Sequence, residues 1–411
     1  MILTVLLSIG SFGAVSALVM TVVNLRLLKP APTAGQNETG ALGAGTATLV
    51  SICIPARNEE ANIEACVRSL LVGSHRAIEV LVYNDQSTDR TGEILAALAA
   101  SDPRVRIVPT LPLGDGWNGK QFGCQRCGEF ASGTWLLFTD ADVRFEPDAI
   151  ARTLLAASRA RAELISTFPR QITATLGEKL VIPLIHFILL SYLPIARMRS
   201  TLDPAASAGC GQFLFVRTSA WSAAGGHTGF KDSMHDGIKL PRAVRRVGLR
   251  TDLFDGTDLC HVRMYQGFAA TWRGFTKNAF EGLGSVGLLL FITVLHALGQ
   301  LLPWLVLAAP VAQWLADFTR LTNYGEWPLL DYIPTAPHYI LATIAACSGL
   351  IGRLLLARRF CQSLISALLH PVGITLMTLI QWHSLYLAKT GRRTWRGRGQ
   401  GPALPVRPQS T

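Results

Sequence analysis

The sequence lacks the cysteine spacings, the repeats and the aromatic pattern that would mark a disulfide-bonded, zinc-binding, repeat or nucleic-acid-binding protein. Its eight cysteines have no spacing that demands a disulfide, and the Cys124-x-x-Cys127 pair lacks the two further nearby ligands that a structural zinc needs. We therefore expect reduced thiols. The chain has no internal repeat, and its net charge of +11 is not accompanied by the stacking aromatics typical of RNA or single-strand binding. These absences argue against a structural zinc site and against nucleic acid as a partner.

Charge is also missing from the first 23 residues, which are apolar and long enough to cross a bilayer at about 1.5 Å per residue. A cleaved signal peptide would carry a basic start and a shorter apolar stretch, so we expect residues 1–28 to form an uncleaved membrane anchor. Arg26 and Lys29 follow directly, and the positive-inside rule then places the next domain on the cytoplasmic side of the inner membrane. Residues 29–47 are rich in Ala, Gly and Thr, which predicts a flexible linker.

Short apolar runs alternate with segments of helical spacing between residues 48 and 138. The runs predict strands and the spacing predicts helices, which is typical of an α/β domain whose mainly parallel sheet is covered by helices on both faces. Ligands of such sheets bind outside the carboxyl ends of the strands. Three polar clusters follow predicted strands, at 55–58, 84–85 and 140–142. We expect them to converge on one crevice.

Asp140 and Asp142 stand one residue apart at the end of the predicted strand 135–138. Carboxylates with this spacing point to the same side and can hold a divalent cation against a diphosphate. A solvated loop would explain the same two residues when they are taken alone. Their position at the shared crevice favours a nucleotide-diphosphate site.

Eight motifs follow one another along the chain. They are Pro55-Ala56-Arg57-Asn58-Glu59-Glu60, Asn84-Asp85-Gln86-Ser87-Thr88-Asp89, Gly116-Trp117-Asn118-Gly119-Lys120, Phe138-Thr139-Asp140-Ala141-Asp142, Ala208-Gly209-Cys210-Gly211-Gln212-Phe213, Gly225-Gly226-His227, His235-Asp236 and Trp272-Arg273-Gly274-Phe275-Thr276-Lys277-Asn278. Together they resemble the family-2 inverting glycosyltransferases of the GT-A fold, over residues 48–280. The similarity is greatest to the membrane-bound branch that glycosylates lipids such as carotenoids, hopanoids or ceramide. It implies a GT-A catalytic domain at residues 48–260, with transmembrane helices on both sides of it in the sequence.

The resemblance implies that four residues line the nucleotide pocket of a UDP-sugar donor: Pro55, Arg57, Glu59 and Asp85. Asp85 would accept hydrogen bonds from the uracil or the ribose. It could instead cap the helix that starts near residue 87, although Asp89 suits that capping role better.

The phosphates and the metal of the donor are expected further along the chain. Lys120 opens the predicted helix 119–131 and can meet donor phosphate or sugar oxygens with the helix amides behind it; the alternative is a solvated surface lysine. Asp140 and Asp142 would engage the ribose and the metal. Mg²⁺ or Mn²⁺ suits an oxygen-rich site that borrows phosphate ligands from its substrate.

Asp236 stands where the family places its catalytic base. It would take the acceptor proton while the acceptor oxygen attacks the anomeric carbon opposite the diphosphate, which inverts the configuration in one displacement. The alternative is an N-cap of the predicted helix 236–247. The sequence departs from the family at His235, where many relatives carry Glu. Gly209, Gly211 and Gln212 are expected on the acceptor side, although a plain strand turn also explains the glycines.

Residues 266–278 lack the Gln-x-x-Arg-Trp motif of processive polysaccharide synthases. Arg273 and Lys277 are one helical turn apart and can share a face toward the diphosphate, whose developing charge they would offset. They can equally anchor an amphipathic interfacial segment, residues 261–282, to lipid headgroups.

Three apolar stretches, 283–315, 339–356 and 364–387, predict C-terminal transmembrane helices over residues 283–388. The first is too long for one upright helix and contains Gly299 and Pro303, so we expect a tilted helix or a tight hairpin.

A basic tail at 389–411, if cytoplasmic, requires an even number of C-terminal spans, which favours the hairpin. Against the hairpin, Arg353, Arg358 and Arg359 would then sit near the outer face. A further apolar stretch, Leu180–Pro194, is too short to span and predicts either an interfacial segment or a buried core helix.

These observations lead to one hypothesis about function. The chain would be a metal-dependent enzyme of the cell membrane that moves a single sugar from a UDP-sugar to a hydroxyl or carboxyl of an apolar lipid acceptor, with Asp236 as base. A processive polysaccharide synthase is the alternative enzyme, and the missing motif disfavours it. A non-catalytic membrane scaffold with a GT-A fold is the alternative from another class, against which the intact Asp140, Asp142 and Asp236 argue.

Overall fold

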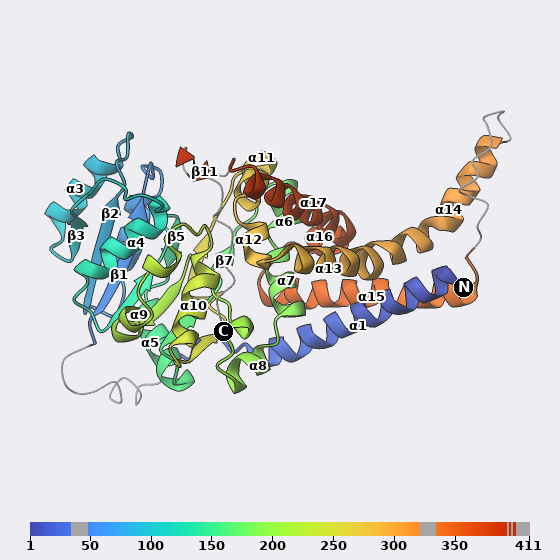
Figure 1. Cartoon of the computed structure of the whole chain (residues 1–411), viewed down its shortest axis with the longest axis horizontal. Coiled ribbons are helices and arrows are strands. Elements are labelled where there is room, and N and C mark those ends of the chain that lie inside the picture. Colours follow the sequence, from blue (N-terminus) through green and yellow to red (C-terminus); the bar gives the residue numbers. More distant parts are fainter. Residues whose placement is uncertain (34–47, 321–333, 393, 396–397, 400–411) are drawn as a thin grey trace.

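The computed structural model describes residues 1–33, 48–320, 334–392, 394–395 and 398–399. It consists of an α/β part at one end and a layer of long helices at the other (Figure 1). The expected linker and basic tail are only partly covered, because residues 34–47 and 400–411 lie outside the described residues.

A seven-stranded sheet forms the centre of the α/β part, in the order β3-β2-β1-β4-β8-β6-β9. The first four strands of this order are parallel to one another, while β8 runs antiparallel to both β4 and β6. The mainly parallel sheet is therefore confirmed. The bounds are β1 Val50–Ala56, β2 Ile78–Asn84, β3 Val105–Val108, β4 Trp135–Phe138, β6 Leu164–Ser166, β8 Leu214–Arg217 and β9 Thr251–Leu253.

Helices cover both faces of the sheet (Figure 1), as the alternating sequence pattern predicts. Every residue of β1 is buried, and successive side chains enter opposite cores: Ile52 and Ile54 one core, Cys53 the other. A smaller sheet lies beside the main one. The bounds of these elements are α2 Ile63–Leu71, α3 Thr91–Ser101, α4 Gly119–Phe130, α5 Ala149–Ala160, α9 Thr218–Ala223, α10 Asp236–Arg246, β5 Val143–Phe145, β7 Arg170–Gln171 and β10 Cys260–Val262, with 3₁₀ turns at Pro204–Ala206 and Thr228–Phe230.

Three helices among the described residues are long and apolar enough to cross a membrane: Ile2–Leu27, Val286–Ala312 and Ala336–Arg359. They carry outward-facing apolar side chains such as Val5, Phe12 and Phe291. A surface of this kind suits lipid rather than water. The bounds of the helices in this layer are α1 Ile2–Leu27, α13 Val286–His296, a π-helical turn Ala297–Leu301, α14 Leu302–Arg320, α15 Ala336–Arg359, α16 Leu364–Leu368 and α17 His370–Lys389.

From Val286 onward the stretch 283–315 is one helical run rather than a hairpin, so the favoured expectation is wrong here. The π turn directly precedes Pro303, whose ring nitrogen cannot donate a helix hydrogen bond, and it absorbs this defect without breaking the run. α15 provides the return. Its first turn lies at the start of α1, where Thr4 Oγ1 is 3.0 Å from His338 Nε2.

The C-terminal end of α15 lies against the α/β part. Arg359 Nε is 2.8 Å from Asp255 Oδ2, and the Arg359 guanidinium also donates to the Leu28 carbonyl. The α13–α14 run and α15 therefore form the out-and-back pair that an even number of C-terminal spans requires. The hairpin would have placed Arg353, Arg358 and Arg359 near the outer face, which was the objection to it; with a single run before α15, this end of α15 lies at the α/β part instead.

After α15 the chain enters the helical layer again and turns back within it. His370, at the start of α17, lies 3.0 Å from Gln300 in the middle of the α13–α14 run. At the other end of α17, the Ser384 hydroxyl accepts a hydrogen bond from the Phe280 N–H at 3.0 Å. α16 and α17 thus lie between the middle of the α13–α14 run and α12, and neither is among the described helices that are long and apolar enough to cross a membrane.

Short helices join the two parts of the molecule: α6 Leu176–Val181, α7 Leu184–Tyr192, α8 Ile195–Ser200, α11 Phe268–Thr276 and α12 Ala279–Leu283. The stretch Leu180–Pro194 is largely α7, whose Leu184, Phe187 and Leu190 are buried. Asn24 of α1 donates to the carbonyls of Leu190 and Leu193 at 2.8 and 2.7 Å. The core-helix alternative therefore describes α7 better than an exposed interfacial segment.

Candidate active site

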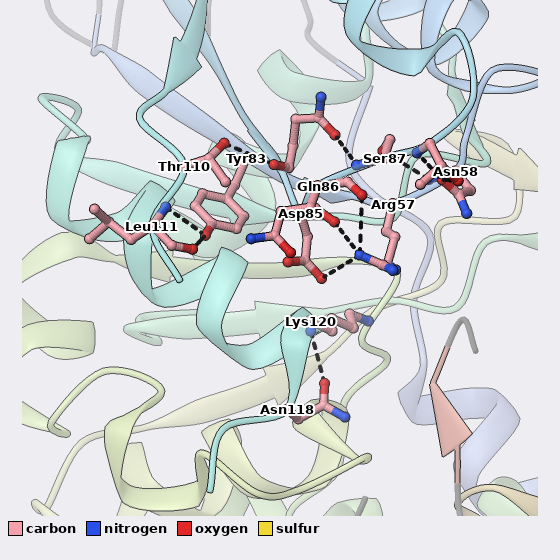
Figure 2. A network of polar contacts seen from close by, with 12 residues as sticks. Arg57, Asn58, Tyr83, Asp85, Gln86, Ser87, Thr110, Leu111, Asn118 and Lys120 are labelled. Atoms are coloured by element: carbon pink, nitrogen blue, oxygen red, sulfur yellow. Dashed lines mark hydrogen bonds and ion pairs between the residues drawn. The ribbon is translucent and has the colours of Figure 1, made fainter. Parts of the chain in front are cut away.

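The ends of β1 and β2 bring the first two polar clusters together. Ala56 pairs with Asn84 in the parallel register, so the residues that follow them emerge side by side. Arg57 Nη1 donates to the Asp85 carbonyl at 2.6 Å and lies 3.8 Å from the Asp85 carboxylate (Figure 2). Asp85 is buried at this edge of the sheet. The predicted meeting of the Arg57 and Asp85 segments is thus observed.

Asp89, not Asp85, satisfies the free N–H groups at the start of α3. Its carboxylate accepts the Thr91 N–H at 3.0 Å and the Glu60 N–H at 3.1 Å. Partial burial opposes ionisation of Asp89, but these hydrogen bonds outweigh it and lower its pKa. Glu59 is buried and accepts from the Asn62 side chain at 3.1 Å. Pro55 lies in β1 beneath α4, where a Cβ on Gly123 would be 2.9 Å from it.

Lys120 connects two carboxylates that are far apart in the sequence. Its Nζ lies 2.7 Å from Asp140 Oδ1 and 3.0 Å from Asp236 Oδ2. Asn118 caps α4 by accepting the N–H groups of Lys120 and Gln121, which fixes where Lys120 starts (Figure 2). The side chain of Lys120 is only 16% exposed, so the alternative of a solvated surface lysine is wrong.

The charges of this cluster support one another. Burial disfavours the charged form of Lys120, but Asp140 and Asp236 raise its pKa well above the usual value. Burial likewise disfavours the charged form of Asp236, and the adjacent ammonium group reverses that effect, so the pKa of Asp236 is lowered. Asp236 is thus an ionised, buried carboxylate with one close cation.

Glycines leave the space that Asp236 occupies. A Cβ at Gly211 would lie 2.1 Å from Asp236 Oδ1, and a Cβ at Gly237 would lie 2.6 Å from the Gly209 carbonyl oxygen. Oδ1 of Asp236 accepts the N–H of Gly237, the next residue, at 2.9 Å, and the N-cap position of α10 belongs to His235. The N-cap alternative for Asp236 is therefore wrong. The Gln212 carbonyl holds the Thr139 hydroxyl at 2.8 Å, which ties this turn to the end of β4.

Two carboxylates, those of Asp140 and Asp142, follow the end of β4. Asp140 is 31% exposed on its side chain, and Asp142 is half-buried two residues further on. In the part of the chain that the structure describes, no group of three or more His, Cys, Asp or Glu side chains gathers to form a complete metal shell. Two carboxylate groups fit Mg²⁺ or Mn²⁺ when substrate phosphates supply further oxygen ligands.

Arg273 and Lys277 come from the layer next to the helical part. α11 packs against α6 and α17, and Trp272 donates to His383 of α17 at 2.9 Å. The Lys277 ammonium lies 5.9 Å from the centre of the Tyr265 ring. This position suits the interfacial role, and the expected contact with the diphosphate stays a prediction.

His227, the last residue of the Gly225-Gly226-His227 motif, is buried in this region, and the sequence analysis predicts no role for it. Trp221 Nε1 donates to its Nδ1 at 3.1 Å, and Phe138 packs edge-on against its ring. Burial lowers the pKa of His227 to about 3, so the ring is neutral at physiological pH. It acts as packing beneath the end of β4.

The match to known proteins agrees with this geometry. Residues 51–221 match the family model of glycosyl transferase family 2. This segment of the chain is therefore similar to the family-2 glycosyltransferases, and the chain has the GT-A fold.

Particular relatives narrow the comparison. A 4,4'-diaponeurosporenoate glycosyltransferase of Staphylococcus aureus is 28% identical over 243 residues, and the match covers 57% of this chain and 62% of the length of that relative. The corresponding protein of Staphylococcus haemolyticus is 28% identical over 267 residues, with 64% and 67% covered. A mannosyltransferase from Pyrobaculum calidifontis, solved with GDP-mannose and Mn²⁺, has the same fold, with a TM-score of 0.53 and 18% identity over 92% of this chain and 98% of that one.

Proposed function

We propose that this glycosyltransferase moves a single sugar from a UDP-sugar to a hydroxyl or carboxyl of an apolar membrane lipid, with inversion. One observation carries the proposal: a single buried ammonium group, that of Lys120, holds the donor-side Asp140 and the acceptor-side Asp236 at 2.7 and 3.0 Å. Transfer requires that the group that binds the donor and the base that deprotonates the acceptor lie close together, because the acceptor oxygen must reach the anomeric carbon while the donor is bound.

The roles of the residues follow from their positions. Arg57 and Asp85 would receive the nucleotide at the ends of β1 and β2. Asp140 and Asp142 would hold Mg²⁺ or Mn²⁺, which offsets negative charge on the leaving diphosphate when it is bound. Lys120 keeps Asp236 ionised until the acceptor arrives. The Asp236 carboxylate would then accept the proton of an acceptor hydroxyl as its oxygen attacks the anomeric carbon.

The helical layer supports a lipid acceptor. Its apolar side chains face outward, and a continuous apolar cluster runs from Ala208, beside the glycine turn, through Trp272 and Phe275 to α17. The relatives named for diaponeurosporenoate agree with an apolar acceptor. Arg26, Lys29 and Arg359 lie at the end of the helical layer that meets the catalytic domain, which supports a cytoplasmic domain at the inner membrane.

The test uses membranes that contain the protein, labelled UDP-glucose, UDP-galactose and UDP-N-acetylglucosamine, and mass spectrometry of the extracted lipids. We expect one hexose on an apolar lipid, and we expect Asp236→Asn to bind UDP but to lose transfer. Asp232→Asn is the matched control, because Asp232 is an exposed carboxylate four residues earlier in the loop that leads to Asp236. This variant should retain transfer. Label found only in long water-soluble polymer would support the processive synthase instead.

A further inference from the structure

The loop that precedes Asp236 is held from two opposite sides. On the side of the donor, the Lys231 carbonyl accepts the Asn118 N–H at 2.6 Å, and Asn118 Nδ2 lies 2.9 Å from Met234 Sδ. Asn118 also caps α4, which carries Lys120. The loop 231–235 and the lysine that pairs with Asp236 are therefore positioned by the same residue.

On the side of the helical layer, the loop is held by Glu281 of α12. One carboxylate oxygen of Glu281 accepts a short hydrogen bond from the Ser233 hydroxyl, and the other accepts the Met234 N–H at 3.1 Å. Ser233 Oγ in turn accepts the His235 N–H at 3.0 Å. One side chain thus reaches, directly or through Ser233, the three residues immediately before Asp236.

His235 closes the same contact from the loop side. A Cβ on Gly282 would lie 3.3 Å from His235 Nε2, so the ring packs closely against the backbone of α12. A larger residue at position 282 would displace the ring. The position where this sequence departs from its family is therefore used for docking the loop on α12.

α12 is itself part of the attachment to the helical layer. It precedes α13, the first helix of the C-terminal out-and-back pair, by the short connection Gly284–Ser285. The Phe280 N–H donates to Ser384 of α17 at 3.0 Å. Any shift of α12 relative to the catalytic domain must pull on the Ser233 and Met234 contacts.

We infer that Glu281 is a positioning residue for transfer: it fixes the loop 233–235 and so directs the Asp236 carboxylate, which makes transfer depend on how α12 is seated in the helical layer. This inference rests on the proposed role of Asp236 as base. Glu281 does not touch the reacting atoms. Its effect is on the rate of the chemical step and not on the binding of the nucleotide, which lies at the ends of β1 and β2.

The experiment compares Glu281→Ala, Glu281→Gln, Ser233→Ala and the Glu281→Ala/Ser233→Ala double variant in membranes, with UDP as the binding probe. Misplacing a catalytic group by about 1 Å can cost about 100-fold in rate, so we expect kcat of Glu281→Ala to fall by about 10-fold to 100-fold. The donor KM and the affinity for UDP should stay within about 2-fold. Because Ser233 and Glu281 share one contact, the double variant should be no slower than the slower single variant.

Two further variants set the scale. Glu281→Gln keeps one acceptor oxygen and should fall between wild type and Glu281→Ala. Glu163→Ala is the matched control, because Glu163 is also half-buried and accepts a backbone N–H, that of Arg250 at 2.9 Å. It lies just before β6, at the end of this strand that is away from the glycine turn 209–212. This variant should transfer at the wild-type rate.

Hydrogen exchange provides a readout that does not depend on activity. The amides of Met234 and His235 should be protected in wild type and lose protection in Glu281→Ala and Glu281→Gln, while the amides of β1 keep theirs. Unchanged protection, or a kcat of Glu281→Ala within about 2-fold of wild type, overturns the inference. Loss of UDP binding in parallel with kcat also overturns it. If Asp236→Asn transfers normally while the loop amides respond as expected, the assignment of the base has failed and the positioning of the loop has not.

Discussion

Replacing Gly211 with alanine should disable transfer while leaving the fold intact. The Cβ of an alanine would lie 2.1 Å from Asp236 Oδ1, whereas real Cβ atoms essentially never come closer than 3.0 Å to another atom. Gly211 has a backbone conformation open to any residue, so the conflict is one of space and not of backbone strain. The steric clash must therefore be relieved by movement of Asp236 or of the turn 209–212.

The size of the effect follows from the movement required. Separating the two atoms to an allowed distance needs a shift of nearly 1 Å, and Asp236 has little freedom, because Lys120 and the Gly237 N–H hold it at 3.0 and 2.9 Å. A 1 Å displacement of a catalytic group corresponds to a loss of about 100-fold in kcat. Forcing a methyl group into a packed site also destabilises the fold by about 1–3 kcal/mol.

The assay is single-turnover transfer from labelled UDP-sugar in membranes, together with UDP binding and thermal unfolding. Gly229→Ala is the matched control, because a Cβ there meets nothing within 4 Å, and it should keep full activity. We expect Gly211→Ala to retain UDP binding and to lose most of its transfer rate. Transfer by Gly211→Ala within a few-fold of wild type would show that Asp236 does not act from the position seen here, and the reasoning about the base would be refuted.

Three further predictions concern charge. Burial raises the pKa of Glu178, but hydrogen bonds from the Ala174 and Gly267 amides outweigh it and lower this pKa from 4.5 to about 2. Glu178 should therefore contribute about 3 kcal/mol of folding stability above pH 4.5, and this contribution is lost as the pH falls toward 2. In thermal unfolding, the melting temperatures of wild type and Glu178→Gln should differ above pH 4.5 and converge near pH 2. Lys120→Met removes the cation that lowers the pKa of Asp236, so the acid limb of the pH–rate profile should move to higher pH, and an unmoved limb would contradict the pairing. Chelation with EDTA should stop transfer and added Mn²⁺ or Mg²⁺ restore it, with Asp142→Asn needing more metal than wild type; full activity in EDTA would exclude the metal role.

Much of the proposed donor side could be predicted from the sequence, for a topological reason. Parallel strands that lie next to one another end at the same edge, so Arg57, Asp85 and Asp140 had to meet once the strands before them were recognised. Lys120 joined them because an N-cap, Asn118, fixes the start of α4 beside β1. Local patterns of this kind are enough to predict at the end of which strand a residue lies.

The proposed acceptor side depends on contacts between distant segments, which no local pattern reveals. Ser233 and Glu281 are ordinary polar residues in the sequence, and only the fold brings them together. The parity argument favoured a hairpin at 283–315 and so predicted the wrong course for α15, although the arginines of α15 argue against that hairpin. Arg353 is instead buried, donating to Ser366 at 2.8 Å and to Gln362 at 3.2 Å in the segment that re-enters the helical layer. An arginine with internal acceptors says little about which side of a membrane it occupies.

Residues 29–31, at the start of the expected linker, are held by the loop that follows β9, while residues 34–47 lie outside the described residues. Asp255, after β9, accepts the Ala31 N–H through its carbonyl at 3.1 Å and donates its own N–H to the Lys29 carbonyl at 2.8 Å, and its carboxylate pairs with Arg359. The end of α1 and the end of α15 are thus fastened to one loop of the sheet. A domain attached at that loop and at Glu281 is held in one orientation toward the helical layer. Under the proposed function, the site could then meet an acceptor in the bilayer without a search by the domain.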